Sequence, residues 1–373
     1  MEILILGGTG AMGIPLVNIL LQSSQETTIT VTSRSTRTSH HDRLMYVVGN
    51  ARDNEFLNEI LSRGKYDVIV DFMNYDLDEF RNRVDILLNS TEHYIWFSSC
   101  RVYADSNNKL TENSERLLET TTDLEFLVTN RYALRKARQE DILNRSGKSN
   151  FTIIRPYITY NTQRLQLGIL EKEQWLYRLM KGKDLVISKE MLDKKTTLTF
   201  GDDVSEAIAE LILQNNPKGE VFQIASPEAI SWKEILQLYV DILHKELGIS
   251  PKIYSSNHIN AIEMLWEGGY NTKYDRNFNR SFYSAKIEEE LNHPINYTPT
   301  IEGLAKCLSQ FIVSSRQFLP INPEYEAYQD ILCNDVADRS YFNLDSEYET
   351  YLNHRNRKIS EITGLENIKA QII

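Results

Sequence analysis

Tyr132 and Lys136 stand four residues apart in a segment, 130–144, whose composition predicts a helix, so both side chains lie on one helix face. An ammonium one turn from a phenol stabilises the phenolate, and such a tyrosine exchanges protons with a carbinol oxygen. Ser99 follows an apolar segment, 94–97, that predicts a strand, and its hydroxyl is suited to hold the same oxygen. Together the three residues predict proton transfer at an alcohol or a ketone.

A glycine-rich segment near the N-terminus predicts a partner for this chemistry. Residues 3–6 are wholly apolar, which indicates a strand buried on both faces of a parallel sheet, and apolar residues recur at helical spacing after residue 13. The glycines between them follow the spacing Gly7-x-x-Gly10-x-x-Gly13. Main-chain amides at such a helix N-terminus predict a diphosphate cradle, and its residues are Gly7, Gly8, Thr9, Gly10, Ala11, Met12 and Gly13.

The strand predicted over 28–32 ends at Ser33 and Arg34. Sites that bind a ribose 2′-hydroxyl usually carry an acid about twenty residues past the glycines, whereas this chain has a hydroxyl and a guanidinium there. Both groups suit a 2′-phosphate, and a charge-assisted hydrogen bond contributes roughly 1.5–3 kcal/mol. We therefore expect NADP(H) to be favoured, with NAD(H) possible, and Asn50 to contact the adenine.

Composition and order of elements indicate the fold class. Strands and helices alternate over the first 156 of the 373 residues, which predicts an α/β fold with a doubly wound parallel sheet. No apolar run approaches ~20 residues and no leader pattern opens the chain, so we expect a cytoplasmic protein without a membrane span. Three scattered cysteines predict neither a disulfide framework nor a metal site. A formal net charge of −11 argues against nucleic acid as a partner.

With these motifs, the chain resembles an extended short-chain dehydrogenase/reductase of the NAD-dependent epimerase/dehydratase family. The glycine spacing matches the cofactor loop of that family, the segment FSSCRVY at 97–103 its strand-five motif, and Tyr132-x-x-x-Lys136 its catalytic helix. Segments 153–160, 200–204, 220–225 and 284–299 also agree. The resemblance therefore covers roughly residues 1–315.

The resemblance implies a Rossmann domain of about seven strands from 1–156 and 200–225, with a small substrate lobe from 157–199 and 226–315. It implies a nucleotide-activated sugar as substrate, hydride transfer at a sugar carbon, often C4, and a homodimer. Tyr132, Lys136 and Pro156 would then also contact the cofactor. The extension 316–373 lies outside the resemblance, and its mixture of tyrosines, acids and apolar residues predicts helices packed on the body or on a partner.

Two departures from the family pattern narrow the expected activity. Dehydratases of the family carry Asp-Glu just after the strand-five hydroxyl, but this chain has Cys100-Arg101, which leaves a 4-ketoreductase or a 4-epimerase. Thr196 also stands where an arginine would hold the sugar-nucleotide diphosphate. Substrate contacts are therefore expected from other side chains, namely Ser99, Arg101, Lys194, Lys195, Arg276 and Arg280.

Two other classes of function fit the same fold. A non-catalytic nucleotide-sensing or RNA-associated member would be expected to lose the Tyr132-Lys136 pair, which this chain keeps. A reductase of a non-sugar alcohol or ketone predicts a substrate lobe without clustered cations. Measured NADPH oxidation with a panel of nucleotide sugars separates these classes.

Overall fold

The computed structural model describes residues 1–23, 26–216, 218–256, 259, 268–314, 318–356 and 371–372. Its centre is a seven-stranded sheet in the order β11-β6-β5-β4-β1-β2-β3, with every pairing parallel. The strands are β1 (Glu2–Leu6), β2 (Thr28–Ser33), β3 (Leu44–Val48), β4 (Tyr66–Asp71), β5 (Thr91–Phe97), β6 (Phe151–Pro156) and β11 (Glu220–Ile224). The doubly wound sheet predicted from the sequence is confirmed.

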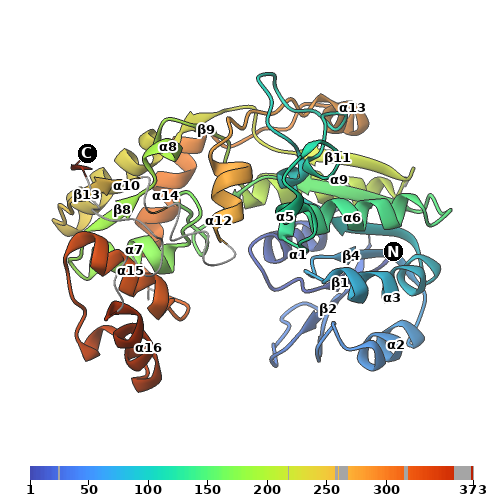
Figure 1. The fold of residues 1–373 in the computed structure, drawn as a ribbon. Coiled ribbons are helices and arrows are strands. Elements are labelled where there is room, and N and C mark those ends of the chain that lie inside the picture. Colours follow the sequence, from blue (N-terminus) through green and yellow to red (C-terminus); the bar gives the residue numbers. More distant parts are fainter. Residues whose placement is uncertain are drawn as a thin grey trace.

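Both faces of the sheet are covered, which explains the continuous apolar run of β1. Ile3 and Ile5 pack on one side and Leu4 and Leu6 on the other, and all four are fully buried. One face carries α1 (Gly13–Gln22) and α9 (Gly201–Gln214). The other carries α2 (Asn54–Ser62), α3 (Leu77–Asn89) and α6 (Tyr132–Asn144). The sheet and its helices form the right-hand part of Figure 1.

A second group of elements stands beside the sheet (Figure 1), and its core includes Trp175 and Trp232. Its strands are short: β7 (Thr159–Tyr160), β8 (Leu185–Ile187), β9 (Lys195–Thr196), β10 (Thr199–Phe200), β12 (Ile230–Ser231) and β13 (Ile253–Ser255). Its helices are α7 (Lys172–Met180), α8 (Lys189–Leu192), α10 (Trp232–Leu247), α12 (Gly268–Asn271) and α14 (Thr300–Val313). Of three further helices, α13 (Ala285–Leu291) packs on β11 and α9, whereas α4 (Leu117–Thr120) and α5 (Leu124–Leu127) pack on α6.

The C-terminal extension forms α15 (Pro323–Cys333) and α16 (Asp345–Arg355), which pack on each other and on the second group. Asp330 of α15 is fully buried and pairs with Arg178 of α7 and with Lys183, each at 2.8 Å. Gln329 accepts a hydrogen bond from the main-chain N–H of Val186 in β8 at 2.8 Å and donates one to its carbonyl at 2.9 Å. The extension is therefore joined to the body by buried polar contacts.

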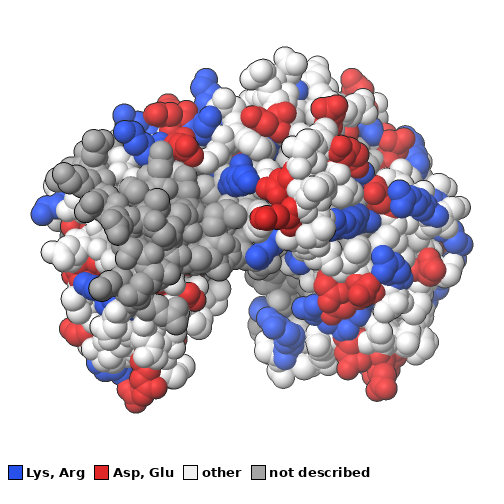
Figure 2. Space-filling model, in the orientation of Figure 1, with Lys and Arg blue, Asp and Glu red and all other residues white. Residues whose placement is uncertain are grey.

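The described surface is mixed in charge. Figure 2 shows acidic and basic side chains interspersed over the face in view. Within the ranges given above, no helix is long and apolar enough to cross a membrane.

Candidate active site

Two cavities lie side by side at the carboxyl ends of the central strands, and Phe72, Met73 and Asn74 line both. The glycine-side cavity, of about 490 Å³, is lined by Gly7, Gly10, Ser33, Arg34 and Asn50 among others. The tyrosine-side cavity, of about 280 Å³, is lined by Met12, Ser99, Arg101, Tyr132, Lys136, Pro156 and Arg276 among others. Ligands of open parallel sheets bind at this edge.

The glycine loop is tightly packed except at one position. Gly7 has φ +71° and donates its N–H to Thr32 Oγ1 at 3.0 Å. A Cβ on Gly13 would lie 2.4 Å from the carbonyl oxygen of Gly8, so the start of α1 touches the strand end. At Gly10, by contrast, a Cβ would meet nothing within 4 Å. The main chain there faces open space at a helix N-terminus, which fits the diphosphate of a dinucleotide.

The far end of the glycine-side cavity carries the residues predicted to select the cofactor. Arg34 is exposed at its rim and forms no ion pair with any residue that the structure describes. Ser33 is buried, and its hydroxyl donates to the carbonyl of Ser35 at 2.8 Å. Arg52 also lines this cavity and pairs with Glu79. The guanidinium of Arg34 is therefore the group available to a 2′-phosphate.

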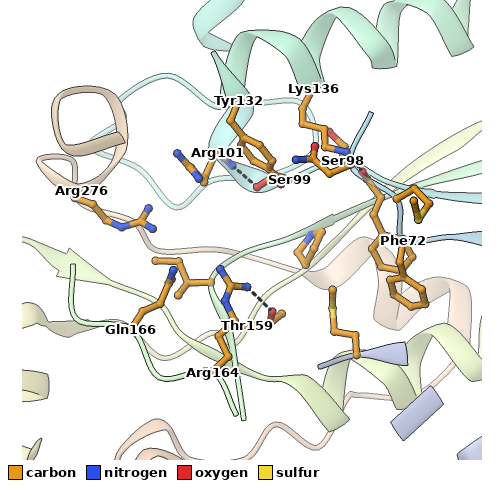
Figure 3. A pocket seen from close by; sticks show the side chains of 16 residues that line it. Phe72, Ser98, Ser99, Arg101, Tyr132, Lys136, Thr159, Arg164, Gln166 and Arg276 are labelled. Atoms are coloured by element: carbon orange, nitrogen blue, oxygen red, sulfur yellow. Dashed lines mark hydrogen bonds between the residues drawn. The ribbon is translucent and has the colours of Figure 1, made fainter. Parts of the chain in front are cut away.

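Tyr132, Lys136 and Ser99 meet along one wall of the tyrosine-side cavity (Figure 3). Lys136 is buried, and its Nζ donates to the carbonyl of Phe97 at 2.7 Å and lies 6.0 Å from the ring centre of Tyr132. Burial lowers the pKa of Lys136 to about 7, and the opposing attraction comes first from Asp71. Ser99 Oγ accepts a hydrogen bond from the N–H of Arg101 at 3.2 Å, which leaves its own proton to donate.

Two buried acids that the sequence analysis did not single out support this wall. Glu140 accepts hydrogen bonds from Ser98, from Arg155 at 2.6 and 2.8 Å, and from Arg116 at 3.0 Å. These bonds tie α6 to the ends of β5 and β6. The sequence does contain a signal for Glu140, because this residue follows Lys136 by one helical turn and so lies on the same buried face of α6.

Asp71, the last residue of β4, is the second buried acid. Its carboxylate accepts from Tyr94 at 2.8 Å, from the N–H of Met73 at 2.9 Å and from Tyr75 at 3.3 Å. Burial raises the pKa of Asp71 to about 6, against these hydrogen bonds and the attraction of Lys136. A buried acid, Asp71, thus lies behind the cavity wall that Lys136 lines.

Arginines dominate the remaining wall of the tyrosine-side cavity. The guanidinium carbon of Arg101 lies 4.7 Å from the ring centre of Tyr132. Figure 3 shows Arg164 and Arg276 across the cavity from that tyrosine, with their guanidinium groups toward the space between. Arg164 donates to Thr159 at 3.4 Å and pairs with Glu171 at 3.2 Å. Arg164 comes from a loop after β7 and was not predicted.

Three of the expected substrate residues lie elsewhere. Lys195 is exposed in β9, Lys194 precedes it, and neither lines the two cavities. Arg280 is fully buried outside the cavities, where it pairs with Asp275 at 2.9 Å and donates to the carbonyls of Tyr103 and Ala104. The charge of Arg280 therefore serves the fold. No cluster of three or more metal-binding side chains occurs in the described ranges.

This fold, a parallel sheet with a glycine loop at its first strand end, defines a dinucleotide-binding protein of the Rossmann class. A family model described as NAD(P)H-binding matches residues 7–196. The chain belongs to this NAD(P)H-binding family, and its parallel sheet with flanking helices is a Rossmann-like α/β fold. A search of curated proteins found no match.

Solved structures share the fold at low sequence identity. The dTDP-glucose 4,6-dehydratase from Bacillus anthracis, in complex with NAD, is 16% identical, and the match covers 85% of this chain and 98% of that chain with a TM-score of 0.63. The UDP-glucuronic acid 4-epimerase from Bacillus cereus, in complex with UDP-glucuronic acid and NAD, is 15% identical, with 83% and 100% covered and a TM-score of 0.62. Pal from Bacillus thuringiensis is 17% identical, with 84% and 99% covered and a TM-score of 0.63.

Proposed function

We propose that the protein is an NADP(H)-preferring oxidoreductase that acts on a nucleotide-activated sugar, as a 4-ketoreductase or a 4-epimerase. The observation that carries this proposal is the convergence of Tyr132, Lys136 and Ser99 on one cavity wall, next to the glycine-side cavity. Structures of the same fold that bind NAD and UDP-glucose or UDP-glucuronic acid support the substrate class.

Each of the three side chains has a distinct role in the proposed reaction. Tyr132 Oη gives its proton to the substrate oxygen during reduction and takes it back during oxidation. Lys136, held by Phe97, stabilises the phenolate that forms when its own amine is protonated, and burial makes that amine lose its proton above a pH of about 7. Ser99 donates its free proton to the same oxygen and so fixes its position. The nicotinamide, when bound, supplies or accepts the hydride.

The residues after Ser99 favour hydride transfer without loss of water. Cys100 is fully buried, its thiol contacts the carbonyl of Arg155 at 3.1 Å, and burial raises the pKa of that thiol. Arg101 is a cation and cannot act as a carboxylic acid. Neither group can serve as the acid and base that an elimination requires. The exposed guanidinium of Arg34 favours NADP(H) and, with it, the reductase over the epimerase.

The test is NADPH oxidation with a panel of nucleotide 4-keto sugars, with Tyr132→Phe as the matched variant. We expect Tyr132→Phe to lose ~10²–10⁴-fold in kcat, because only the phenolic hydroxyl is removed, while the Kd for NADPH changes less than about twofold. Equal activity in the variant refutes the catalytic assignment. Purified protein that carries NAD and interconverts two nucleotide sugars without added cofactor establishes the epimerase instead.

A further inference from the structure

The tyrosine-side cavity holds more positive charge than hydride transfer requires. Three arginines line it beside Lys136, namely Arg101, Arg164 and Arg276, and no Asp or Glu does so among the described residues. The cation nearest the catalytic phenol is Arg101, whose guanidinium covers the ring of Tyr132 at 4.7 Å. Any group bound beside Tyr132 therefore lies against a guanidinium.

Counter-charges near these arginines are few and shared. Asp275 pairs with Arg276 and with Arg280 at 2.9 Å, accepts from Tyr157 at 3.2 Å, and lies 3.7 Å from Arg101 Nε. Arg101 Nε is buried and makes no hydrogen bond to any group in the described part of the chain. One carboxylate thus faces three guanidinium groups, and a buried cation with incomplete pairing favours an anionic ligand.

The position of Arg101 indicates which part of the substrate carries the anion. Its guanidinium carbon lies 4.7 Å from the ring centre of Tyr132, and both residues line the same cavity. An anion bound by Arg101 therefore lies beside the substrate oxygen that reacts at Tyr132. The anion that meets Arg101 is therefore attached to the reacting ring.

We infer that the substrate is a sugar acid, in which the ring that reacts at Tyr132 carries a carboxylate bound by Arg101. This inference rests on the proposed function and narrows its substrate class. A planar guanidinium fork binds both oxygens of a carboxylate, which a hydroxymethyl group cannot match. Arg164 and Arg276, on the opposite side, add to the attraction for the acid.

The test compares matched nucleotide sugars that differ only in the acid, such as UDP-glucuronate with UDP-glucose and GDP-mannuronate with GDP-mannose. Calorimetric titration of the NADP-loaded Tyr132→Phe variant measures binding without turnover. We expect the acid to bind roughly 10- to 100-fold tighter in at least one pair. Arg101→Met should abolish this ratio and Arg101→Lys should reduce it, whereas Arg81→Met, an exposed arginine of α3, should leave it unchanged.

The outcomes separate this inference from the proposed function. Equal or tighter binding of the neutral member in every pair, or no binding of either member, overturns the inference. If neutral nucleotide sugars are turned over in a Tyr132-dependent way, without preference for the acid, the proposed oxidoreductase function is supported. The same result refutes the inference that the substrate is a sugar acid. Tight, Arg101-dependent binding of the acid without hydride transfer in the wild type supports the sugar-acid site and refutes the oxidoreductase.

Discussion

Lys136 Nζ donates a 2.7 Å hydrogen bond to the carbonyl of Phe97, the last residue of β5. The chain continues from that strand directly into Ser99, so one strand end positions both the lysine and the serine. Glu140 holds the same helix to the same strand end through Ser98. The spacing between phenol, ammonium and hydroxyl is therefore set by the packing of α6 on β5.

The buried ammonium predicts a dependence of stability on pH. The pKa of Lys136 is lowered from 10.5 to about 7 by burial, so between these values the unfolded chain carries a proton that the folded chain has lost. Unfolding takes up that proton, and stability due to this group rises with pH across the window. In urea titrations from pH 7 to pH 9, wild type should gain ~2 kcal/mol relative to Lys136→Met. A constant difference would contradict the lowered pKa.

Arg34 is expected to select the cofactor. Arg34→Ser removes the guanidinium at the rim of the glycine-side cavity, so the ratio of kcat/KM for NADPH over NADH should fall ~10–100-fold. Arg37→Ser, in the same exposed loop but outside the cavity lining, is the matched control and should keep the wild-type ratio. A preference for NADPH that survives in Arg34→Ser would assign selectivity to other residues.

Gly10 and Gly13 of the glycine loop should respond differently to alanine. Gly13→Ala places a methyl group 2.4 Å from the carbonyl of Gly8 and should destabilise the fold by about 1–3 kcal/mol in urea titrations. Gly10→Ala meets open space, so its stability should stay within ~0.5 kcal/mol of wild type. Its Kd for NADPH should nevertheless rise at least about tenfold, because the methyl group enters the diphosphate cradle. Unchanged NADPH binding by Gly10→Ala would place the diphosphate elsewhere.

The extension is expected to stabilise the fold without taking part in catalysis. Asp330→Asn leaves Arg178 and Lys183 without their shared partner and should cost about 3–5 kcal/mol of unfolding free energy. Asp345→Asn removes an exposed pair with Arg339 and should cost less than ~1 kcal/mol. At a temperature where both variants are folded, kcat/KM should match wild type. A selective loss of kcat/KM in Asp330→Asn would indicate a role for the extension at the site.

The parts of the site that the sequence reveals are those encoded locally. A glycine loop between β1 and α1, and a tyrosine and lysine one turn apart, are patterns within a few residues, and the structure brings them to adjacent cavities. Arg164 comes from a loop and Asp275 from a short π-helix (Thr272–Arg276), and the positions of both depend on contacts distant in sequence. No local pattern therefore marks them.

Lys195 is the opposite case, a residue whose place in the sequence indicates a site contact that the fold does not provide. Its place in the sequence suggested a contact with substrate, but its strand pairs antiparallel with β12 and its side chain is exposed. Likewise, the charge of Arg280 gave no indication that Asp275 and two carbonyls would enclose it. Residue type predicts which groups can bind an anion, and only the tertiary fold decides which of them face the ligand.

Gln329 satisfies the main-chain N–H and carbonyl of Val186 with a single side chain, at the outer strand of a small sheet. An outer strand with open hydrogen-bonding groups is a template on which another chain can add a strand. The glutamine occupies that template at Val186. Loss of α15 would therefore expose this edge of β8 and promote self-association of the protein. The consequence would be aggregation and not a change in turnover.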